Sequence, residues 1–194
     1  MRVSREQAEK NRANVVHVAG RMFRQRGFDG VGIADIMKAS GLTHGGFYGQ
    51  FASKEQLVAE ASGTAMSRTL RRWQTVLAEA AGAPMKAFAA FYLSPAHRDH
   101  PETGCVFATL ASDAARAGPE VKAAFEAGIE DQLDLIREAF VAQGMAPKAA
   151  RTAAIASLST LVGALVLSRA VNDPKLSGDI LAAAGRSVSS VPDG

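Results

Sequence analysis

Seven residues between positions 43 and 54 have the chemistry expected of a surface that meets a phosphate chain. Thr43 offers a hydroxyl at the expected start of a short helix, where free N–H groups favour an anion. Glycines allow a partner to approach the backbone closely, a phenol can donate to phosphate, and a lysine supplies a cation. The residues that we expect to contact DNA are Thr43, His44, Gly45, Gly46, Tyr48, Gln50 and Lys54.

Two short helices must position these residues. Apolar side chains at helical spacing predict one helix over residues 33–40, which Gly41 ends, and a second helix over residues 43–51 with Thr43 as its N-cap. The sequence Ser53-Lys54-Glu55-Gln56 is a capping box that begins a long helix, expected to reach about residue 81. This pattern is typical of a helix-turn-helix, whose second helix enters the DNA major groove.

The remaining chain predicts further helices and no strands. Ser4 and Gln7 form a capping box for a first helix that ends at Gly27. Runs of alternating β-branched residues are missing, and Pro/Gly breaks separate the segments beyond residue 82. We therefore expect an all-α fold, with later helices over residues 84–97, 102–117, 120–143, 148–171 and 176–187, and a frayed tail from Gly185.

Charge divides the chain into two parts. Residues 1–54 hold nine Lys or Arg and four Asp or Glu, a net charge of +5, whereas the other 140 residues carry a net charge of −2. A basic N-terminal quarter is the pattern expected of a DNA-binding head. The single cysteine suits a reducing cytoplasm. No secretory signal is expected, because the N-terminus is charged and lacks an apolar region, and no membrane span is expected, because the apolar segment 153–168 is too short.

The stretch from Gly41 to Glu55 closely resembles the N-terminal signature of the TetR family of bacterial transcriptional regulators. That resemblance implies a nine-helix homodimer with a three-helix DNA-binding head over residues 1–52. A helical ligand-binding and dimerisation body would follow over residues 53–187, with a flexible tail over 188–194. The expected partners are a double-stranded DNA operator, a small-molecule or electrophile effector and a second copy of the chain.

The same resemblance assigns roles within the signature. Thr43, Gly45, Tyr48 and Lys54 carry over as DNA contacts. Gln50 lies where the family often has a histidine, which puts one base or phosphate contact in doubt. Gly32 lies where a Ser or Thr cap is common, and glycine weakens an N-cap by only a few tenths of a kcal/mol.

A nearly uncharged helix over residues 148–171 predicts dimerisation. Its apolar residues are too numerous for one face, so the helix is expected to be buried on more than one side, within the subunit or across a two-fold axis. We favour the two-fold bundle. The residues expected at this interface are Ile155, Leu158, Val162, Leu165 and Val166, with Leu161 on the same broad face.

The body holds the candidates for a sensor. Aromatic residues could line an apolar cavity or form plain core: Phe88, Phe91, Tyr92, Phe107, Phe125 and Phe140. Cys105 lies near the expected start of the 102–117 helix, where the helix dipole favours a thiolate. It resembles the reactive cysteine of an electrophile-responsive TetR subgroup, although a buried, inert cysteine is the alternative.

Enzymatic and metal-binding alternatives are weak. His97 and His100 lack a third ligand at zinc-like spacing, and no nucleophile motif supports a triad of Cys105, His100 and Asp113. We therefore expect no enzyme, no metal and no cofactor. Three hypotheses remain: a repressor released by a small molecule, a regulator switched by modification of Cys105, and an all-α enzyme or binding protein whose head does not read DNA.

Overall fold

The computed structural model describes residues 4–80 and 82–190, and within these ranges it contains helices and no strand. This confirms the all-α prediction. Two short 3₁₀ turns, η1 and η2, accompany the α-helices. The elements are α1 (Arg5–Arg26), α2 (Ile33–Ala39), η1 (His44–Gly46), α3 (Lys54–Glu79), α4 (Pro84–Tyr92), α5 (Pro95–Asp99), η2 (Pro101–Thr103), α6 (Phe107–Arg116), α7 (Pro119–Ala142), α8 (Pro147–Ala170) and α9 (Pro174–Ser189).

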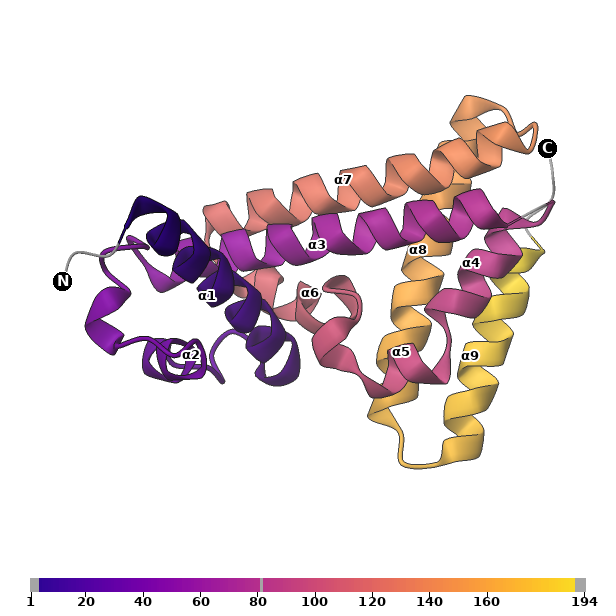
Figure 1. Ribbon diagram of the computed structural model, residues 1–194. Helices are drawn as coiled ribbons and strands as arrows, with labels where there is room; N and C mark the ends of the chain where they lie inside the picture. Colours follow the sequence, from indigo (N-terminus) through magenta and orange to yellow (C-terminus); the bar gives the residue numbers. More distant parts are fainter. Residues whose placement is uncertain (1–3, 81, 191–194) are drawn as a thin grey trace.

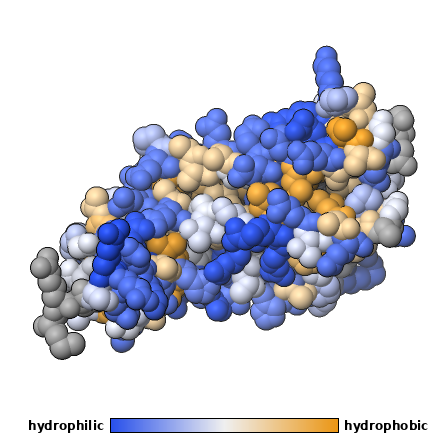
Figure 2. Space-filling view, turned by 45° about the horizontal axis from the view of Figure 1, so that its top comes forward, coloured by the Kyte–Doolittle hydropathy of each residue, from blue (hydrophilic) through white to orange (hydrophobic). Residues whose placement is uncertain are grey.

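The chain forms an elongated molecule with a small head at one end (Figure 1). α1, α2 and η1 make the head, and α3 leads away from it beside α7 along the length of the molecule. α8, α4 and α9 pack together at the opposite end, and α6 lies beneath α3. Hydrophilic residues dominate the head end of the surface, whereas apolar patches gather towards the other end (Figure 2).

Local signals define the helix ends in the head. The Ser4 hydroxyl accepts the Gln7 amide at 3.2 Å, and the Ser53 hydroxyl accepts the Gln56 amide at 3.0 Å, so both predicted capping boxes form. Gly27 ends α1 with a φ of 73°, which glycine adopts without strain. Phe28 then folds back onto Phe23, with their ring centroids 5.7 Å apart.

The predicted helix over residues 43–51 is wrong. Only His44–Gly46 is helical, as a 3₁₀ turn, and the chain then continues through further turns to Gln50. Three glycines in this segment, Gly45, Gly46 and Gly49, weaken any regular helix. The segment is held instead from inside, because Phe47 and Phe51 are fully buried and stack on each other at 5.4 Å.

Three boundaries in the body also differ from the prediction. The expected 84–97 helix is divided into α4 and α5, because Ser94 and Pro95 begin a new helix in which the Ser94 hydroxyl accepts the His97 amide. The expected 102–117 helix begins only at Phe107, after η2. α9 continues to Ser189 instead of fraying from residue 185; Val188 is buried there, and residues 191–194 lie outside the described ranges.

α8 divides its apolar residues between two environments. Leu158 and Leu165 are buried within the subunit, which corrects their assignment to a dimer surface. Ile155 and Val166 are 46% and 43% exposed, and Val162 is half-buried. α8 is the one described helix long and apolar enough by composition to cross a membrane, but it packs between α7 and α9 as a core helix does.

The glycine turn of the head gives a test of this fold. Gly41 has a φ of 73° and no neighbour within 4 Å of an added Cβ, so replacement with alanine strains only the backbone. We expect Gly41→Ala to lower the free energy of unfolding by about 1–2 kcal/mol, measured by chemical denaturation. Gly45→Ala is the matched control, because Gly45 has an open surround and an ordinary φ. Equal stability of the two variants would contradict the turn geometry.

Candidate DNA-binding surface and effector cavity

The turn after Gly41 presents one exposed surface. Thr43, His44 and Gly45 are exposed, and the Tyr48 side chain is 66% exposed although it is aromatic. Tyr48 packs edge-on against buried Phe47, with ring centroids 5.3 Å apart, and against His44 at 6.1 Å. A large aromatic side chain held in this way, with its hydroxyl in solvent, is suited to a phosphate contact.

The other predicted DNA contacts are placed differently. Gln50 is half-buried, and its side-chain amide donates to the Gly46 carbonyl at 3.2 Å, so it braces the turn from within. Gly46 is itself half-buried. Lys54 is half-buried at a separate cleft of about 340 Å³, which Phe28 and Val121 also line, between the head and the body.

Arg12 stabilises the end of this turn through contacts with Phe51 and the Gln50 carbonyl, a role that the sequence did not indicate. Its guanidinium lies 4.6 Å from the Phe51 ring centroid and donates to the Gln50 carbonyl at 3.4 Å. Both terminal nitrogens also pair with the Glu60 carboxylate, one of them at 2.6 Å. Since a forked guanidinium–carboxylate pair fixes direction as well as distance, α1, the end of the turn and α3 are held in one arrangement.

A cavity of about 380 Å³ lies in the body between α3, α4, α5 and the loop that leads to α6. Trp73 forms a buried wall, Phe91 is half-buried, and Cys105 lies at the loop. This volume is within the range of small-molecule sites in proteins. The residues that line it are Thr69, Arg72, Trp73, Phe91, Ser94, Ala96, His97, His100, Thr103, Gly104 and Cys105.

His97 connects two walls of this cavity. The carbonyl of Tyr92 lies 2.6 Å from Nδ1 and the amide of Cys105 lies 2.8 Å from Nε2. A carbonyl can only accept and an amide can only donate, so the ring is neutral with its proton on Nδ1. Burial is the main cause that lowers the pKa of His97 to about 4. The hydrogen bond to the Tyr92 carbonyl opposes this by raising the pKa, and the positive charges of Arg169 and Arg72 lower it. With both nitrogens used, His97 is not available as a metal ligand.

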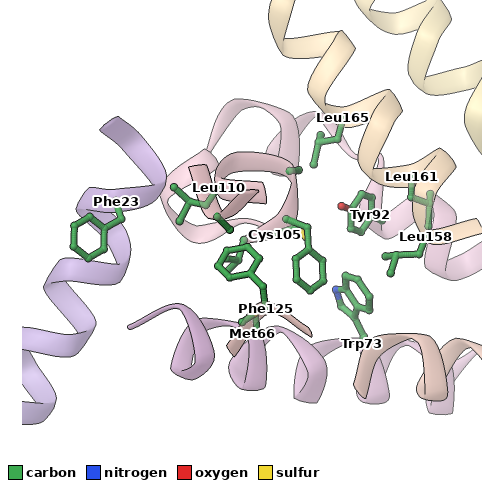
Figure 3. Close-up of a cluster of buried hydrophobic side chains, with 14 of the residues drawn as sticks. Phe23, Met66, Trp73, Tyr92, Cys105, Leu110, Phe125, Leu158, Leu161 and Leu165 are labelled. Atoms are coloured by element: carbon green, nitrogen blue, oxygen red, sulfur yellow. The ribbon is translucent and has the colours of Figure 1, made fainter. Parts of the chain in front are cut away.

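Cys105 does not have the environment expected of a thiolate. Its side chain is 1% exposed and lies two residues before α6 begins. Burial raises the pKa of this thiol, and this effect exceeds the lowering by its hydrogen-bonding neighbours. Figure 3 shows the sulfur among buried side chains that include Tyr92 and Trp73. The expected activation by the helix dipole is therefore corrected: the resting thiol is protonated at neutral pH.

The loop beside the cavity also contacts the head. Arg24, near the end of α1, donates twice to the Glu102 carbonyl in η2, through Nε at 2.9 Å and Nη2 at 2.5 Å. Burial lowers the pKa of Arg24 to about 10, so it stays charged at neutral pH. Arg169 of α8 holds α5, which precedes this loop, by donating to the His97 carbonyl at 2.6 Å and to the Arg98 carbonyl at 2.9 Å.

Of the aromatic residues predicted for a cavity, only Phe91 lines it. The other predicted aromatics are buried core: Phe88, Tyr92, Phe107, Phe125 and Phe140. The sequence analysis did not identify Trp73 and Arg72 as cavity residues, because both lie inside the long helix α3 and belong to no local motif. Their spacing within a long amphipathic helix was the only signal, and it does not distinguish a cavity wall from core.

His97 gives the body a pH-dependent stability. In the unfolded chain its imidazole takes up a proton near pH 6.5, whereas the folded ring does so only near pH 4. Acid therefore favours unfolding, and the loss begins as the pH falls below about 6.5. Between pH 7 and pH 4 we expect His97 to account for about 2–3 kcal/mol of lost stability. Urea denaturation of the protein and of His97→Gln across this range measures it, and identical pH profiles would contradict it.

Two family models match the chain. The first, described as bacterial regulatory proteins of the tetR family, matches residues 15–61, which include the exposed turn. The second, described as the C-terminal domain of LmrA/YxaF-like transcriptional regulators, matches residues 81–176. Together they cover parts of both the head and the body.

Sequence similarity to these curated relatives covers about a third of the chain. The transcriptional regulator AcrR of Shigella flexneri is 34% identical over 59 residues, which are 30% of this chain and 27% of AcrR. The regulator TtgR of Pseudomonas putida is 36% identical over 58 residues, which are 30% of this chain and 28% of TtgR. The aligned segment thus spans about a quarter of each relative.

Solved structures share the whole fold. A TetR regulator of Chloroflexus aurantiacus superposes with a TM-score of 0.78 at 24% identity, over 95% of this chain and 97% of the other. Reduced NemR of E. coli superposes with a TM-score of 0.77 at 17% identity, over 95% and 100%. The head matches the tetR family model over residues 15–61, and the fold agrees along nearly the full length of the chain. The chain belongs to the TetR family of bacterial transcriptional regulators, which are DNA-binding transcription factors and not enzymes.

Proposed function

We propose that this protein is a cytoplasmic, homodimeric repressor that binds a palindromic operator and is released by a small molecule in the body cavity. The observation that carries the proposal is the exposed turn at Thr43, His44, Gly45 and Tyr48, which is braced by Arg12 and buried Phe47. A rigid, polar, glycine-containing surface on a basic head is suited to the phosphates and base edges of a groove. The proposal requires neither cofactor nor membrane.

Exposed apolar residues at the far end of the molecule support the dimer. Ile155, Val166 and Leu167 of α8 and Leu176 of α9 are all at least 43% exposed, although each side chain is large and apolar. Two-fold packing of α8 and α9 would remove these residues from water. A two-fold dimer also supplies two heads, which is what a palindromic operator requires.

The contact between Arg24 and the Glu102 carbonyl supports effector release. Thr103, Gly104 and Cys105 line the cavity, and the preceding residue, Glu102, holds the end of α1. A molecule that displaces this loop therefore also displaces the head. AibR, a protein of the same fold with a TM-score of 0.64 at 17% identity, has been crystallised with both isovaleryl coenzyme A and operator DNA.

DNA recognition is tested by selecting bound duplexes from a random-sequence pool and measuring affinity for the enriched site. We expect log affinity to fall steeply with log salt, by about −0.9 per phosphate neutralised. Tyr48→Phe is expected to weaken binding to all duplexes by about tenfold, because it removes the phosphate partner at the exposed turn. Lys54→Gln removes a cation of the basic head at the start of α3, beside the separate cleft, and we expect a similar loss from the weaker attraction to phosphates.

Lys86→Gln is the matched control for charge. Lys86 is an exposed lysine of α4 in the body, so its loss changes the net charge equally without removing a proposed contact. Its affinity is expected to equal that of the unmodified protein. If no duplex is enriched and affinity does not depend on salt, the proposed function fails in favour of a family member whose head does not read DNA.

Covalent modification of Cys105 is a second candidate switch. The position of Cys105 favours this switch, because Cys105 lines the cavity and its backbone amide donates a hydrogen bond to the His97 ring. Its buried, protonated state means that an electrophile would have to enter the cavity before reacting.

Cys105→Ser distinguishes the two switches. If the thiol is the sensor, the variant binds the selected duplex normally and is no longer released by a quinone or an alkylating agent, as measured by fluorescence anisotropy of labelled duplex. Because serine is close to cysteine in size, the cavity is expected to persist. Release of the variant at the same reagent concentration as the unmodified protein would eliminate Cys105 as the sensor.

A further inference from the structure

We propose that the effector of this cavity is a small aromatic carboxylate, whose anionic group pairs with Arg72 and whose ring lies against Phe91 and Trp73. This inference rests on the proposed function for the role of the cavity, but it concerns the chemistry of the ligand itself. It follows from the charge, the geometry and the size of the wall.

The charge of the cavity wall has one sign. Among the described residues that line it, Arg72 is the one with a permanent charge, and neither Asp nor Glu is present. His97 contributes no charge, because both its ring nitrogens are committed to backbone groups in the neutral form. A cationic ligand would therefore be repelled by the Arg72 guanidinium, with no carboxylate in the wall to offset the repulsion. An anionic ligand would form an ion pair with Arg72.

The nearest acidic side chains are already engaged. The Glu102 carboxylate lies 3.7 Å from the His100 ring and 4.0 Å from Arg21, and Asp99 pairs with Arg98 at 2.7 Å. Half-buried Arg169 does not line the cavity, and its side chain donates to backbone carbonyls only. The field inside the cavity is consequently positive.

Arg72 is placed to bind a ligand that is both flat and anionic. Its guanidinium carbon lies 5.4 Å from the Phe91 ring centroid, within the range of a cation–π contact. The contrast with Arg12 is informative, since Arg12 also lies over a phenylalanine but is neutralised by Glu60. Arg72 has no such carboxylate within the described residues, so its forked donors are available for a carboxylate.

The other walls favour an aromatic body of modest size. Trp73 is buried at the back of the cavity, where it packs on Phe88 with ring centroids 4.7 Å apart. The Ser94 hydroxyl, which accepts the His97 amide, still has its own proton to donate to a ligand oxygen. A volume of about 380 Å³ accommodates one or two rings with a short acidic chain.

Trp73 makes the test direct, because it is the only tryptophan of the chain and it lines the cavity. Quenching of its fluorescence is titrated with 3-phenylpropionate, with the neutral isostere 3-phenylpropanamide, and with hexanoate as an anion that lacks a ring. We expect the aromatic acid to bind about tenfold more tightly than either the amide or hexanoate, since each lacks one of the two recognised groups.

Two arginine variants locate the effect. Arg72→Gln is expected to bind the acid and the amide with equal affinity, and Arg72→Lys to restore part of the difference through charge alone. Arg71→Gln is the matched control, because Arg71 is exposed on the same helix but does not line the cavity. Because Arg72 is exposed, we expect its replacement to leave the fold intact. Circular dichroism of each variant checks that its helices are kept.

The inference is overturned if the amide binds as tightly as the acid, if none of the three compounds quenches Trp73 saturably, or if Arg71→Gln reduces affinity as much as Arg72→Gln. These outcomes are separable from failure of the proposed function, because ligand binding is measured without DNA. Selective binding of the acid by a protein that enriches no duplex would support the cavity chemistry and reject the repressor.

Discussion

The packing of α3 against both ends of the molecule is the constraint on which the other contacts depend. Near its start, Ala61 faces α1 so closely that a Cβ at Gly20 would lie 3.4 Å from the Ala61 carbonyl. Near its end, Trp73 packs on Tyr92, with ring centroids 5.5 Å apart. The same 26-residue helix therefore forms part of the head interface and part of the cavity wall. In the proposed function, α3 is therefore a second route by which a change at the cavity could reach the head.

A second connection between head and body runs through the loop that precedes α6. Arg24 binds the Glu102 carbonyl from the head side, Arg169 binds the His97 carbonyl from the body side, and His97 binds the Cys105 amide between them. Each contact is made to the backbone, so the conformation of the loop matters more than the identity of most of its side chains. In the proposed function, a ligand that favours one conformation of this loop over another therefore also shifts the equilibrium of the head.

Burial sets the protonation states of the two chemically reactive side chains in the cavity wall, whereas an exposed side chain is suited to recognise the charge of a ligand. Cys105 and His97 are the reactive types in the wall, yet burial holds one protonated and the other neutral. Arg72, which is exposed at the mouth, keeps its charge and its donors. In the effector proposal, Arg72 therefore recognises the charge of a ligand, whereas the thiol of Cys105 is accessible only to a molecule that has already entered the cavity.

Residue types and their order were enough to predict the helical class and the basic head. They also predicted both capping boxes and the turns at Gly27 and Gly41, because a cap or a turn depends on residues within about one helical turn of one another. The resemblance of residues 41–55 correctly identified the family. Tertiary structure alone decided that three glycines and two buried phenylalanines turn residues 44–50 into successive turns, that Cys105 is buried, and that Leu165 faces inward while Val166 faces outward. These outcomes depend on which distant helix covers each side chain. Helical periodicity shows that a face is apolar, but only the packing of the other helices shows whether that face meets core, cavity or solvent.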